Sequence, residues 1–353
     1  MWSLVNRTRF AAERTFARDP EGAEVLVVAV KGTFDIHPDG ATSVAEQQVP
    51  LCRVPVFRDP HPQAASSLLY EADLLLDKPA TDVLVHGRAH APGGAAATQV
   101  EVGLRVGPVA KRVLVLGDRR WEQGMLGLRL TEPQPFVTMP LLYERAFGGI
   151  VEGAGADGGA AVEARNPVGR GFAKQAADLA GRPAPNLEDP AARIGRWDDR
   201  PRPVGMGPIA RHWAPRVALA GTHDAQWERA RMPLPPRDFQ LRFHQCAPED
   251  QQVPGYLRGG EVVELRNLTP GGSLRFALPS MVPGFTVHIR GGKETHPGNL
   301  HTVIVEPDEG RVILVWHLAL PCHDAVYSLK RVVVEERTPP PGSAGAPRQE
   351  KIA

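Results

Sequence analysis

Twelve histidines and three cysteines are the residues of this sequence that could bind a transition metal. His86 and His90 are four positions apart, a spacing that places both side chains on one face of a strand. Zinc needs three or four N, S or O ligands that converge at about 2.0–2.3 Å. The sequence has neither an HExxH motif nor the second cysteine that would complete a PCxxC site at Cys322. We expect single histidines that act as hydrogen-bond partners, and neither a metal ion nor a cofactor. The histidines that we expect to act singly include four near the carboxyl end: His296, His301, His317 and His323.

Nucleophilic catalysis would need a serine or cysteine beside a base and an orienting carboxylate. No serine lies in a GxSxG motif, and Cys246 adjoins an apolar stretch in which a small buried side chain is the ordinary interpretation. Two histidines directly precede aspartates, but neighbours on a strand point to opposite faces. The sequence therefore predicts no catalytic residue. A hydrolase is the alternative, because triad members can converge from distant positions. Its candidate residues are His212, His223, His323, Asp224 and Asp324.

The middle of the sequence is rich in arginine and tryptophan. Arginine forms forked contacts with carboxylates and backbone carbonyls, and an extended, proline-rich segment needs such donors where it is buried. These side chains either fix an irregular segment to the body or include an exposed subset that binds a partner. The candidate partner-binding residues are Arg170, Arg196, Trp197, Arg200, Arg202, Arg211 and Trp213. The Gly/Ala-rich stretch at residues 153–159 is a second candidate contact region.

Charge and hydropathy argue against several functional classes. Lys and Arg number 41 and Asp and Glu 40, so the net charge of +1 attracts neither nucleic acid nor an anionic membrane. Three cysteines without close spacing argue against a disulfide framework. No window reaches the roughly 18 apolar residues of a membrane span, and the amino terminus lacks the apolar core of a signal peptide. We expect a cytoplasmic protein with no nucleic-acid or membrane partner.

Short stretches of β-forming residues alternate with turn residues along most of the chain. The 36 glycines and 35 prolines favour turns and strand ends and disfavour long helices. In the first half we expect strands at residues 25–36, 82–89, 99–106 and 112–116, whereas residues 68–76 fit either strand or helix. In the second half we expect strands at residues 239–243, 261–267, 273–278, 285–290, 302–306, 312–317 and 326–335. The pattern predicts a mainly β protein.

These strands define two β-rich regions, residues 1–147 and 239–336, made of short antiparallel strands in sandwich or barrel-like sheets. Residues 148–238 between them are irregular, with one short helix expected at residues 174–179. We expect this middle segment to pack on the strands, because a structureless loop of such length is improbable in a compact domain. Residues 337–353 are rich in Pro, Gly and Ser, and we expect them to be a disordered tail.

Several longer strings occur in a defined order: KGTFDI (31–36), YEADLLLDKPATDVLVHG (70–87), PFVTMPLLYERAFGG (135–149), NPVGRGF (166–172), PNLEDP (185–190), RPVGMGPIARHWAPR (202–216) and AGTHDAQWERARMPLPPRDFQLRF (220–243). With these strings, the sequence resembles the family of domain-of-unknown-function proteins encoded beside type VI secretion spike and PAAR-repeat proteins. The resemblance covers about residues 1–336. It departs from the family pattern at Gly32, where the family has alanine, and in a Gly/Ala insert at residues 153–161.

The resemblance implies a non-enzymatic chaperone or adaptor that holds a toxic effector and helps to load it onto the secretion spike. The implied partners are a secreted effector and, as further candidates, a spike or PAAR-repeat protein. The family implies no catalytic residues for this sequence. The YERAFGG and NPVGRGF strings either build the fold or contact the partner.

Overall fold

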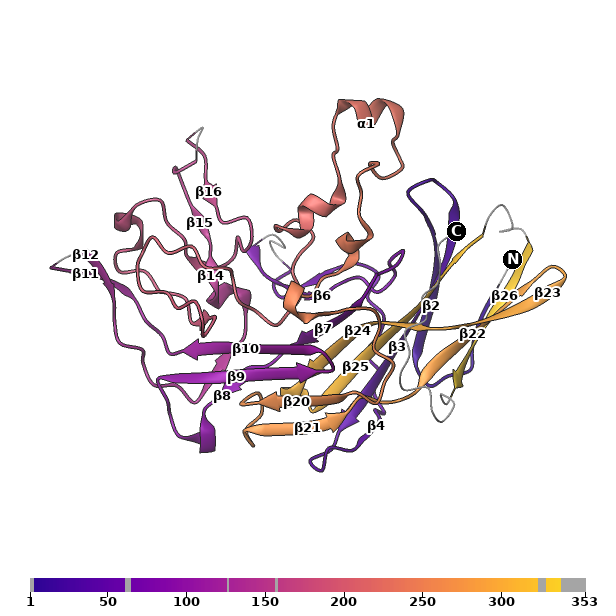
Figure 1. The fold of residues 1–353 in the computed structure, drawn as a ribbon, viewed down its shortest axis with the longest axis horizontal. Coiled ribbons are helices and arrows are strands. Elements are labelled where there is room, and N and C mark those ends of the chain that lie inside the picture. Colours follow the sequence, from indigo (N-terminus) through magenta and orange to yellow (C-terminus); the bar gives the residue numbers. More distant parts are fainter. Residues whose placement is uncertain (1–2, 61–64, 126, 156–157, 323–327, 338–353) are drawn as a thin grey trace.

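The computed structural model describes residues 3–337 except 61–64, 126, 156–157 and 323–327. Strands form most of it, and the described residues contain a single short α-helix, α1 (Ala225–Ala230). Three larger sheets and several two-stranded ribbons make up the body (Figure 1). The prediction of a mainly β protein with little helix is confirmed. Beyond Arg337, the tail that we expect to be disordered lies outside the described residues.

The largest sheet has seven strands and carries the candidate site described below. Along the sheet the strands follow the order β19 (Gln252–Val253), β7 (Thr81–Val85), β24 (Asn299–Glu306), β25 (Arg311–Pro321), β3 (Glu24–Ile36) and β2 (Ala11–Arg18), and β4 (Thr42–Val44) also pairs with β3. Its neighbours are antiparallel except for β7 and β24, which are parallel. The sheet is open, with β19 and β2 at its edges.

A five-stranded antiparallel sheet and a four-stranded sheet complete the body. The first has the order β18 (Leu187–Glu188), β10 (Val109–Leu116), β9 (Gln99–Val106), β20 (Val262–Arg266) and β21 (Ser273–Ala277). The second has the order β1 (Ser3–Asn6), β26 (Leu329–Arg337), β22 (Val282–Ile289) and β23 (Gly292–Pro297).

The remaining described chain consists of loops that connect short two-stranded ribbons and 3₁₀ helices. The ribbons pair β5 (Val56–Phe57) with β6 (Leu68–Tyr70), β8 (Arg88–His90) with β13 (Thr138–Pro140), β11 (Trp121–Gly124) with β12 (Gly127–Leu130), β14 (Phe147–Gly148) with β17 (Arg170–Gly171), and β15 (Ile150–Val151) with β16 (Ala161–Val162). The 3₁₀ helices are η2 (Pro92–Gly94), η3 (Tyr143–Arg145), η4 (Ala176–Leu179), η5 (Arg216–Ala220), η6 (Leu241–His244), η7 (Glu249–Gln251) and η8 (Pro307–Glu309).

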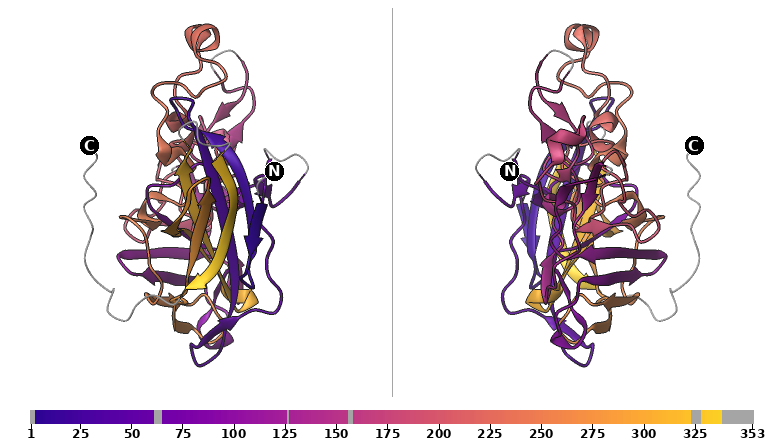
Figure 2. Two further views of the ribbon diagram at one scale, coloured as in Figure 1. Left: turned by 90° about the vertical axis from the view of Figure 1, so that its right-hand side faces the viewer. Right: turned by 90° about the vertical axis from the view of Figure 1, so that its left-hand side faces the viewer.

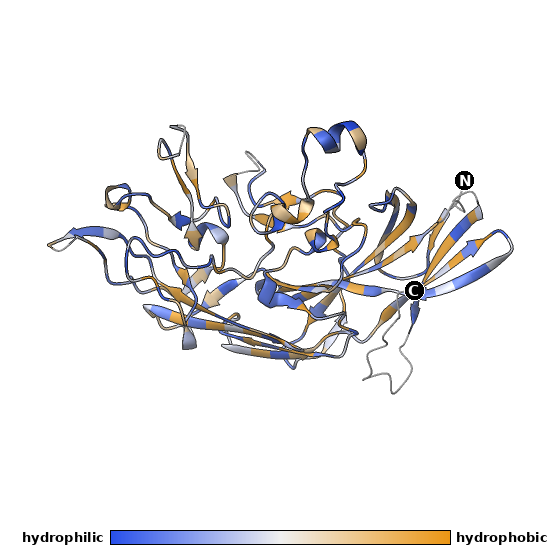
Figure 3. Ribbon diagram, turned by 45° about the horizontal axis from the view of Figure 1, so that its top comes forward, coloured by the Kyte–Doolittle hydropathy of each residue, from blue (hydrophilic) through white to orange (hydrophobic). Residues whose placement is uncertain are grey.

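The hydropathy pattern of each strand follows the number of faces that it buries. Strand β9 alternates apolar and polar residues because one of its faces meets the core and the other meets solvent, and Figure 3 shows such alternation along the strands. Strand β3 has an apolar run because both of its faces are covered by other parts of the chain. The main core contains apolar residues from all three larger sheets, among them Val30, Val102 and Val332. A smaller core around Trp121 and Phe147 lies within residues 121–197.

The two β-rich regions share the seven-stranded sheet. Strand β7 of the first region lies beside β24 of the second, and β3 of the first region pairs along its length with β25. Residues 148–238 contain only short strands, 3₁₀ helices and α1. The helix expected at residues 174–179 is the 3₁₀ helix η4, and the ambiguous stretch at 68–76 begins as strand β6 and continues as loop.

One expected strand, residues 239–243, is wrong. These residues enter the 3₁₀ helix η6, in which the backbone N–H of Phe243 donates to the carbonyl of Gln240 and that of Gln245 to Arg242. The alternating pattern FQLRF resembles a strand, but in the fold Phe239 and Phe243 pack ring against ring at 5.8 Å. Tertiary packing has overridden the local pattern.

Two segments of the middle region project from the body. One is the β15–β16 ribbon (residues 150–155 and 158–162), and the other is the α1 arm (residues 221–240). In Figures 1 and 2 both segments extend toward the same end of the molecule. Among the described residues, no helix is long and apolar enough to cross a membrane.

Candidate functional site

One face of the seven-stranded sheet packs on the main core. The opposite face carries a buried layer of charged and polar side chains. The alternation of strands β7, β24 and β25 sends Val83, Val303 and Leu314 to the main core and sends Asp82, Thr302 and the neighbouring polar residues to the opposite face. Loops from several parts of the chain cover this face. The KGTFDI and YEADLLLDKPATDVLVHG strings supply many of its members, namely Lys31, Tyr70, Glu71, Asp73, Lys78, Asp82 and His86, all of them buried or partly buried.

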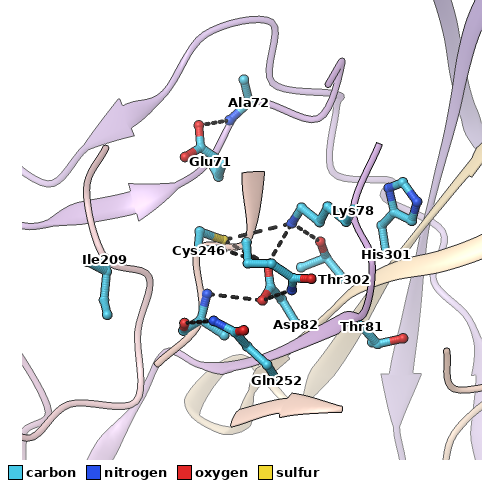
Figure 4. Close-up of polar contacts among 12 residues, drawn as sticks. Glu71, Ala72, Lys78, Thr81, Asp82, Ile209, Cys246, Gln252, His301 and Thr302 are labelled. Carbon is cyan, nitrogen blue, oxygen red and sulfur yellow. Dashed lines mark hydrogen bonds and ion pairs between the residues drawn. The ribbon is translucent and has the colours of Figure 1, made fainter. Parts of the chain in front are cut away.

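Lys78 and Asp82 form the best-enclosed ion pair of this polar layer. The Nζ of Lys78 lies 2.7 Å from Oδ2 of Asp82 and also donates to Thr302 Oγ1 at 3.0 Å (Figure 4). Asp82 in turn accepts hydrogen bonds from the backbone N–H of Cys246 at 2.9 Å and from the side chain of Gln245 at 2.7 Å. One carboxylate therefore joins strand β7 to the loop that covers it.

The same arrangement recurs around Lys31 of strand β3. Its Nζ lies 2.9 Å from Oδ2 of Asp73, and that oxygen also accepts the backbone N–H of Cys52 at 2.6 Å. In both places an aspartate binds one buried lysine and one cysteine backbone. The lysine nitrogens lie 3.8 Å from Cys52 Sγ and 4.0 Å from Cys246 Sγ.

The surroundings of Lys78 and Asp82 favour the charged forms of both side chains. Burial alone would lower the pKa of Lys78, but the Asp82 carboxylate outweighs this effect and the pKa is raised. Burial would raise the pKa of Asp82, but Lys78 and the donated hydrogen bonds lower it. Burial raises the pKa of the Cys246 thiol. A lysine held as ammonium and a cysteine held as thiol are poor nucleophiles. The contacts of this cluster instead hold strand β7 to the loop that covers it.

Glu71 ties the middle segment to the polar layer. Its two carboxylate oxygens lie 2.6 Å from Arg216 Nη1 and 2.9 Å from Arg211 Nη2. Arg216 also donates to the backbone carbonyls of Phe243 and Ile209. Burial would raise the pKa of Glu71, but the two guanidinium groups lower it. These arginines fix an irregular segment through ionic and carbonyl contacts.

A group of buried histidines lies at one side of the layer. The rings of His301 and His317 stack at 4.2 Å, and Tyr256 stacks on His301 at 5.8 Å. Burial and the nearby Lys78 lower the pKa of His301 to about 3, and burial and His301 lower the pKa of His317 well below its usual value. Both imidazoles are therefore neutral at physiological pH. His301 Nε2 lies 2.9 Å from Asp77 Oδ1.

A small cavity of about 10 Å³ lies in this layer between Lys31, Lys78 and His317. That volume accommodates about one water molecule. This cavity can therefore hold a water molecule that bridges the polar side chains.

His86 and His90, whose spacing would place them on one face of a strand, have separate partners. Arg58 Nη2 lies 3.3 Å from His86 Nδ1, whereas His90 Nε2 lies 3.0 Å from Asp308 Oδ1. In the part of the chain that the structure describes, no group of three His, Cys, Asp or Glu residues is arranged to hold a metal ion.

The hydrolase candidates are likewise not brought together where they are described. His212 accepts a hydrogen bond from Trp213 Nε1 at 3.0 Å, whereas the ring of His223 packs on Trp227. Asp224 caps α1 by accepting the Trp227 backbone N–H at 2.8 Å. His323 and Asp324 lie outside the described residues.

The YERAFGG and NPVGRGF strings build the fold. The buried side chain of Asn166 donates from Nδ2 to the carbonyls of Tyr143 at 2.8 Å and Phe147 at 2.9 Å. Gly148 has a φ of 150°, and a Cβ there would meet the Asn166 backbone carbonyl. Because the two strings interlock so closely, glycine is required at this position.

The sequence-predicted partner residues divide between interior and surface. Trp213 is fully buried and meets Tyr143 edge to face at 5.4 Å, and Arg170 donates from Nε to the Glu144 carbonyl at 2.9 Å. Arg211 is bound to Glu71 as described above, and Trp197 packs against the smaller core.

Three predicted partner residues remain at the surface. Arg196 is exposed and pairs with Asp198 at 2.9 Å, and Arg202 pairs with exposed Glu249 at 3.3 Å. Arg200 donates from Nη2 to the Ala173 carbonyl at 2.5 Å, so it anchors the chain even though it is accessible. The surface members of the set are therefore Arg196, Arg200 and Arg202.

The projecting segments carry apolar side chains that sequence reasoning missed. Ile150 and Val162 are direct cross-strand neighbours on the β15–β16 ribbon, and they are 46% and 45% exposed. Val217 on η5 and Leu241 on η6 lie at the base of the α1 arm, where these two helices pack together, and they are 46% and 39% exposed. The cross-strand register, which places Ile150 beside Val162, was not visible in the sequence.

A family model described as "Uncharacterized protein conserved in bacteria (DUF2169)" matches residues 21–317 of the chain. No curated protein and no solved structure matches the chain. The matched segment spans the polar layer and both projecting segments.

Proposed function

This chain belongs to the DUF2169 family of bacterial proteins, and we propose that it is a non-enzymatic adaptor that holds a secreted effector of the type VI secretion system. In this proposal it acts in the cytoplasm and helps to load the effector onto the spike or a PAAR-repeat protein. The resemblance of its ordered strings to the family encoded beside spike and PAAR-repeat genes supports this context.

The observation that carries the proposal is the apolar surface of the two projecting segments. Ile150 and Val162 are partly exposed on the β15–β16 ribbon, and Val217 and Leu241 are partly exposed at the base of the α1 arm. When a partner removes exposed apolar groups from water, the free energy falls and binding is favoured. Because both projections extend toward the same end of the molecule, one client protein can contact both (Figure 2).

The α1 arm is held in place, which lowers the entropic cost of binding. At its base the backbone N–H of Thr222 donates to the Asp238 carboxylate at 3.0 Å. Near its tip Arg231 donates to the carbonyl of Pro20, in the turn between β2 and β3. The body therefore presents the arm as a pre-organised surface.

The test is co-expression with a type VI effector encoded in the same gene cluster. We expect the soluble amount of effector to rise and the two proteins to co-purify without chemical change to the effector. An unrelated protein of similar size serves as the control client. If no effector of the cluster co-purifies with the wild-type chain, the proposal fails.

A further inference from the structure

The outer face of the five-stranded sheet carries a group of arginines that is separate from the projecting segments. Alternation along β9, β10, β20 and β21 sends Val102, Val113 and Val263 to the core and sends the intervening side chains to solvent. The charged members of this outer face are Arg105, Arg112, Arg266, Arg275, Glu101 and Glu264.

The two glutamates neutralise this face only in part. Glu101 lies 3.7 Å from Arg112 and 3.8 Å from Arg266, and so it shares its single charge between two guanidinium groups. Glu264 lies 3.3 Å from Arg275. Arg105 forms no ion pair with any described residue. Glu261 lies beside Arg105 and Arg275, but its carboxylate accepts the backbone N–H groups of Arg258 and Gly259, so the four exposed guanidinium groups keep unused donors that point to solvent.

The centre of the face is open. Gly103 lies between Arg112 and Arg266 in the strand register, and it has no side chain to separate them. A hollow of about 300 Å³ lies nearer the β9–β10 turn and is lined by Arg105, Gly107, Glu261, Val262, Glu264 and Arg275. A carboxylate of a partner could therefore reach the guanidinium groups without displacing a protein side chain.

We propose that this arginine face binds an acidic surface of a partner protein, as a second docking site beside the projecting segments. This inference rests on the proposed function, since an adaptor must bind its delivery target while its effector is held elsewhere. Arginine is suited to such contacts because its fork matches a carboxylate. The outward positions of β9, β10, β20 and β21 carry no aromatic residue for base stacking, which favours a protein over a nucleic acid.

Substitution at Gly103 tests the face without removing an arginine. A Cβ at this position would lie 3.5 Å from Arg266 Cβ, an ordinary contact, so both Gly103→Ala and Gly103→Glu should fold. The probe is a fluorescein-labelled polyglutamate peptide, measured by anisotropy at low salt. We expect Gly103→Glu to weaken binding about tenfold or more by placing a carboxylate between the arginines. Gly103→Ala should stay within about twofold of wild type, as a neutral surface change does.

A matched charge control uses Arg129, which is exposed and paired with Glu122 on the β11–β12 ribbon. Arg129→Gln lowers the net charge by one, as Gly103→Glu does, but it should leave peptide binding unchanged. Equal losses in both variants would overturn the proposal, because they would reflect net charge alone. Tighter binding of a single-stranded oligonucleotide of equal charge would overturn the assignment to a protein partner.

The same variants separate this inference from the proposed function. Gly103→Glu should still co-purify with the effector, because the projecting segments are unchanged. If wild type holds no effector while peptide binding still depends on residue 103, the proposed function fails and the arginine face stands. If the effector is held while Gly103→Glu binds the peptide as wild type does, the arginine face alone is wrong.

Discussion

Lys78 and Asp82 form an ion pair that the protein encloses almost completely, with 2.7 Å between Nζ and Oδ2 and side chains that are 3% and 0% exposed. Asp82→Asn would leave a buried ammonium group without its carboxylate. Removing one partner of a buried pair typically costs about 3–5 kcal/mol, and we expect a loss of that size in the free energy of unfolding. Urea denaturation measures it.

The exposed pair between Arg129 and Glu122 is the matched control. Its N–O distance is also 2.7 Å, but solvent screens it, so Glu122→Gln should change stability by less than about 1 kcal/mol. A loss below about 1 kcal/mol for Asp82→Asn would show that the polar layer is not a determinant of stability. The double change Lys78→Met with Asp82→Leu should recover part of the single loss.

Trp213 and Arg196 were both candidates for partner binding, and the fold predicts opposite effects for their removal. Trp213 is fully enclosed, so Trp213→Ala should cost about 3–5 kcal/mol of stability through cavity formation. Arg196 is exposed and bound only within its own turn, so Arg196→Ala should stay within about 0.5 kcal/mol of wild type. Thermal unfolding of the two variants checks this contrast. Similar midpoints for both variants would show that Trp213 is not enclosed in the core.

The buried histidines predict a loss of stability in mild acid. Burial, aided by nearby cations, lowers the pKa of His86 to about 3, of His244 to about 4 and of His301 to about 3. The unfolded chain takes up protons at these groups below pH of about 6.5, whereas the folded chain does not. Unfolding therefore becomes easier as pH falls from 6.5 toward 4, by up to about 1.4 kcal/mol per pH unit for each histidine.

Urea denaturation at pH 7 and pH 5 measures this effect. The free energy of unfolding should be clearly lower at pH 5. His301→Gln removes one titrating group. The difference in the free energy of unfolding between pH 7 and pH 5 should therefore be smaller for this variant than for wild type. An equal difference in both proteins would show that His301 is not held neutral by the fold.

The regular strands were accessible from sequence because their patterns follow burial directly. Residues 99–106 alternate and form β9 with the predicted bounds, and the apolar run at 25–36 lies within β3. The FQLRF pattern at 239–243 failed because local i to i+3 hydrogen bonds and ring packing determine that segment. Alternation predicts a strand only where a neighbouring strand is available.

The polar layer could not be predicted, because its contacts join distant positions. Lys31 meets Asp73 and Cys52, and Asp82 meets Cys246, although none of these contacts follows from local spacing. In sequence, residues 68–76 fit either strand or helix, and neither interpretation places the charged residues of YEADLLLDK in the interior. Only the sheet register and the covering loops show that they are internal.

The apolar pair on the β15–β16 ribbon gives the most direct test of effector binding. Ile150→Ser together with Val162→Ser replaces two exposed aliphatic side chains, and it should leave the fold intact because neither side chain belongs to a core cluster. If these side chains contact the effector, their loss should weaken the complex about tenfold or more, which corresponds to about 1.4 kcal/mol. Biolayer interferometry with the co-purified effector measures the change.

Val137→Ser is the matched control, since Val137 is 48% exposed but lies outside both projecting segments. We expect it to bind the effector as tightly as wild type does. Val217→Ser with Leu241→Ser tests the base of the α1 arm in the same assay. Two projections that contact one client act together, so the combined four-residue variant should lose more affinity than either pair. Wild-type affinity in the combined variant would refute apolar docking on these segments, because a client that needs neither pair must be held by another surface.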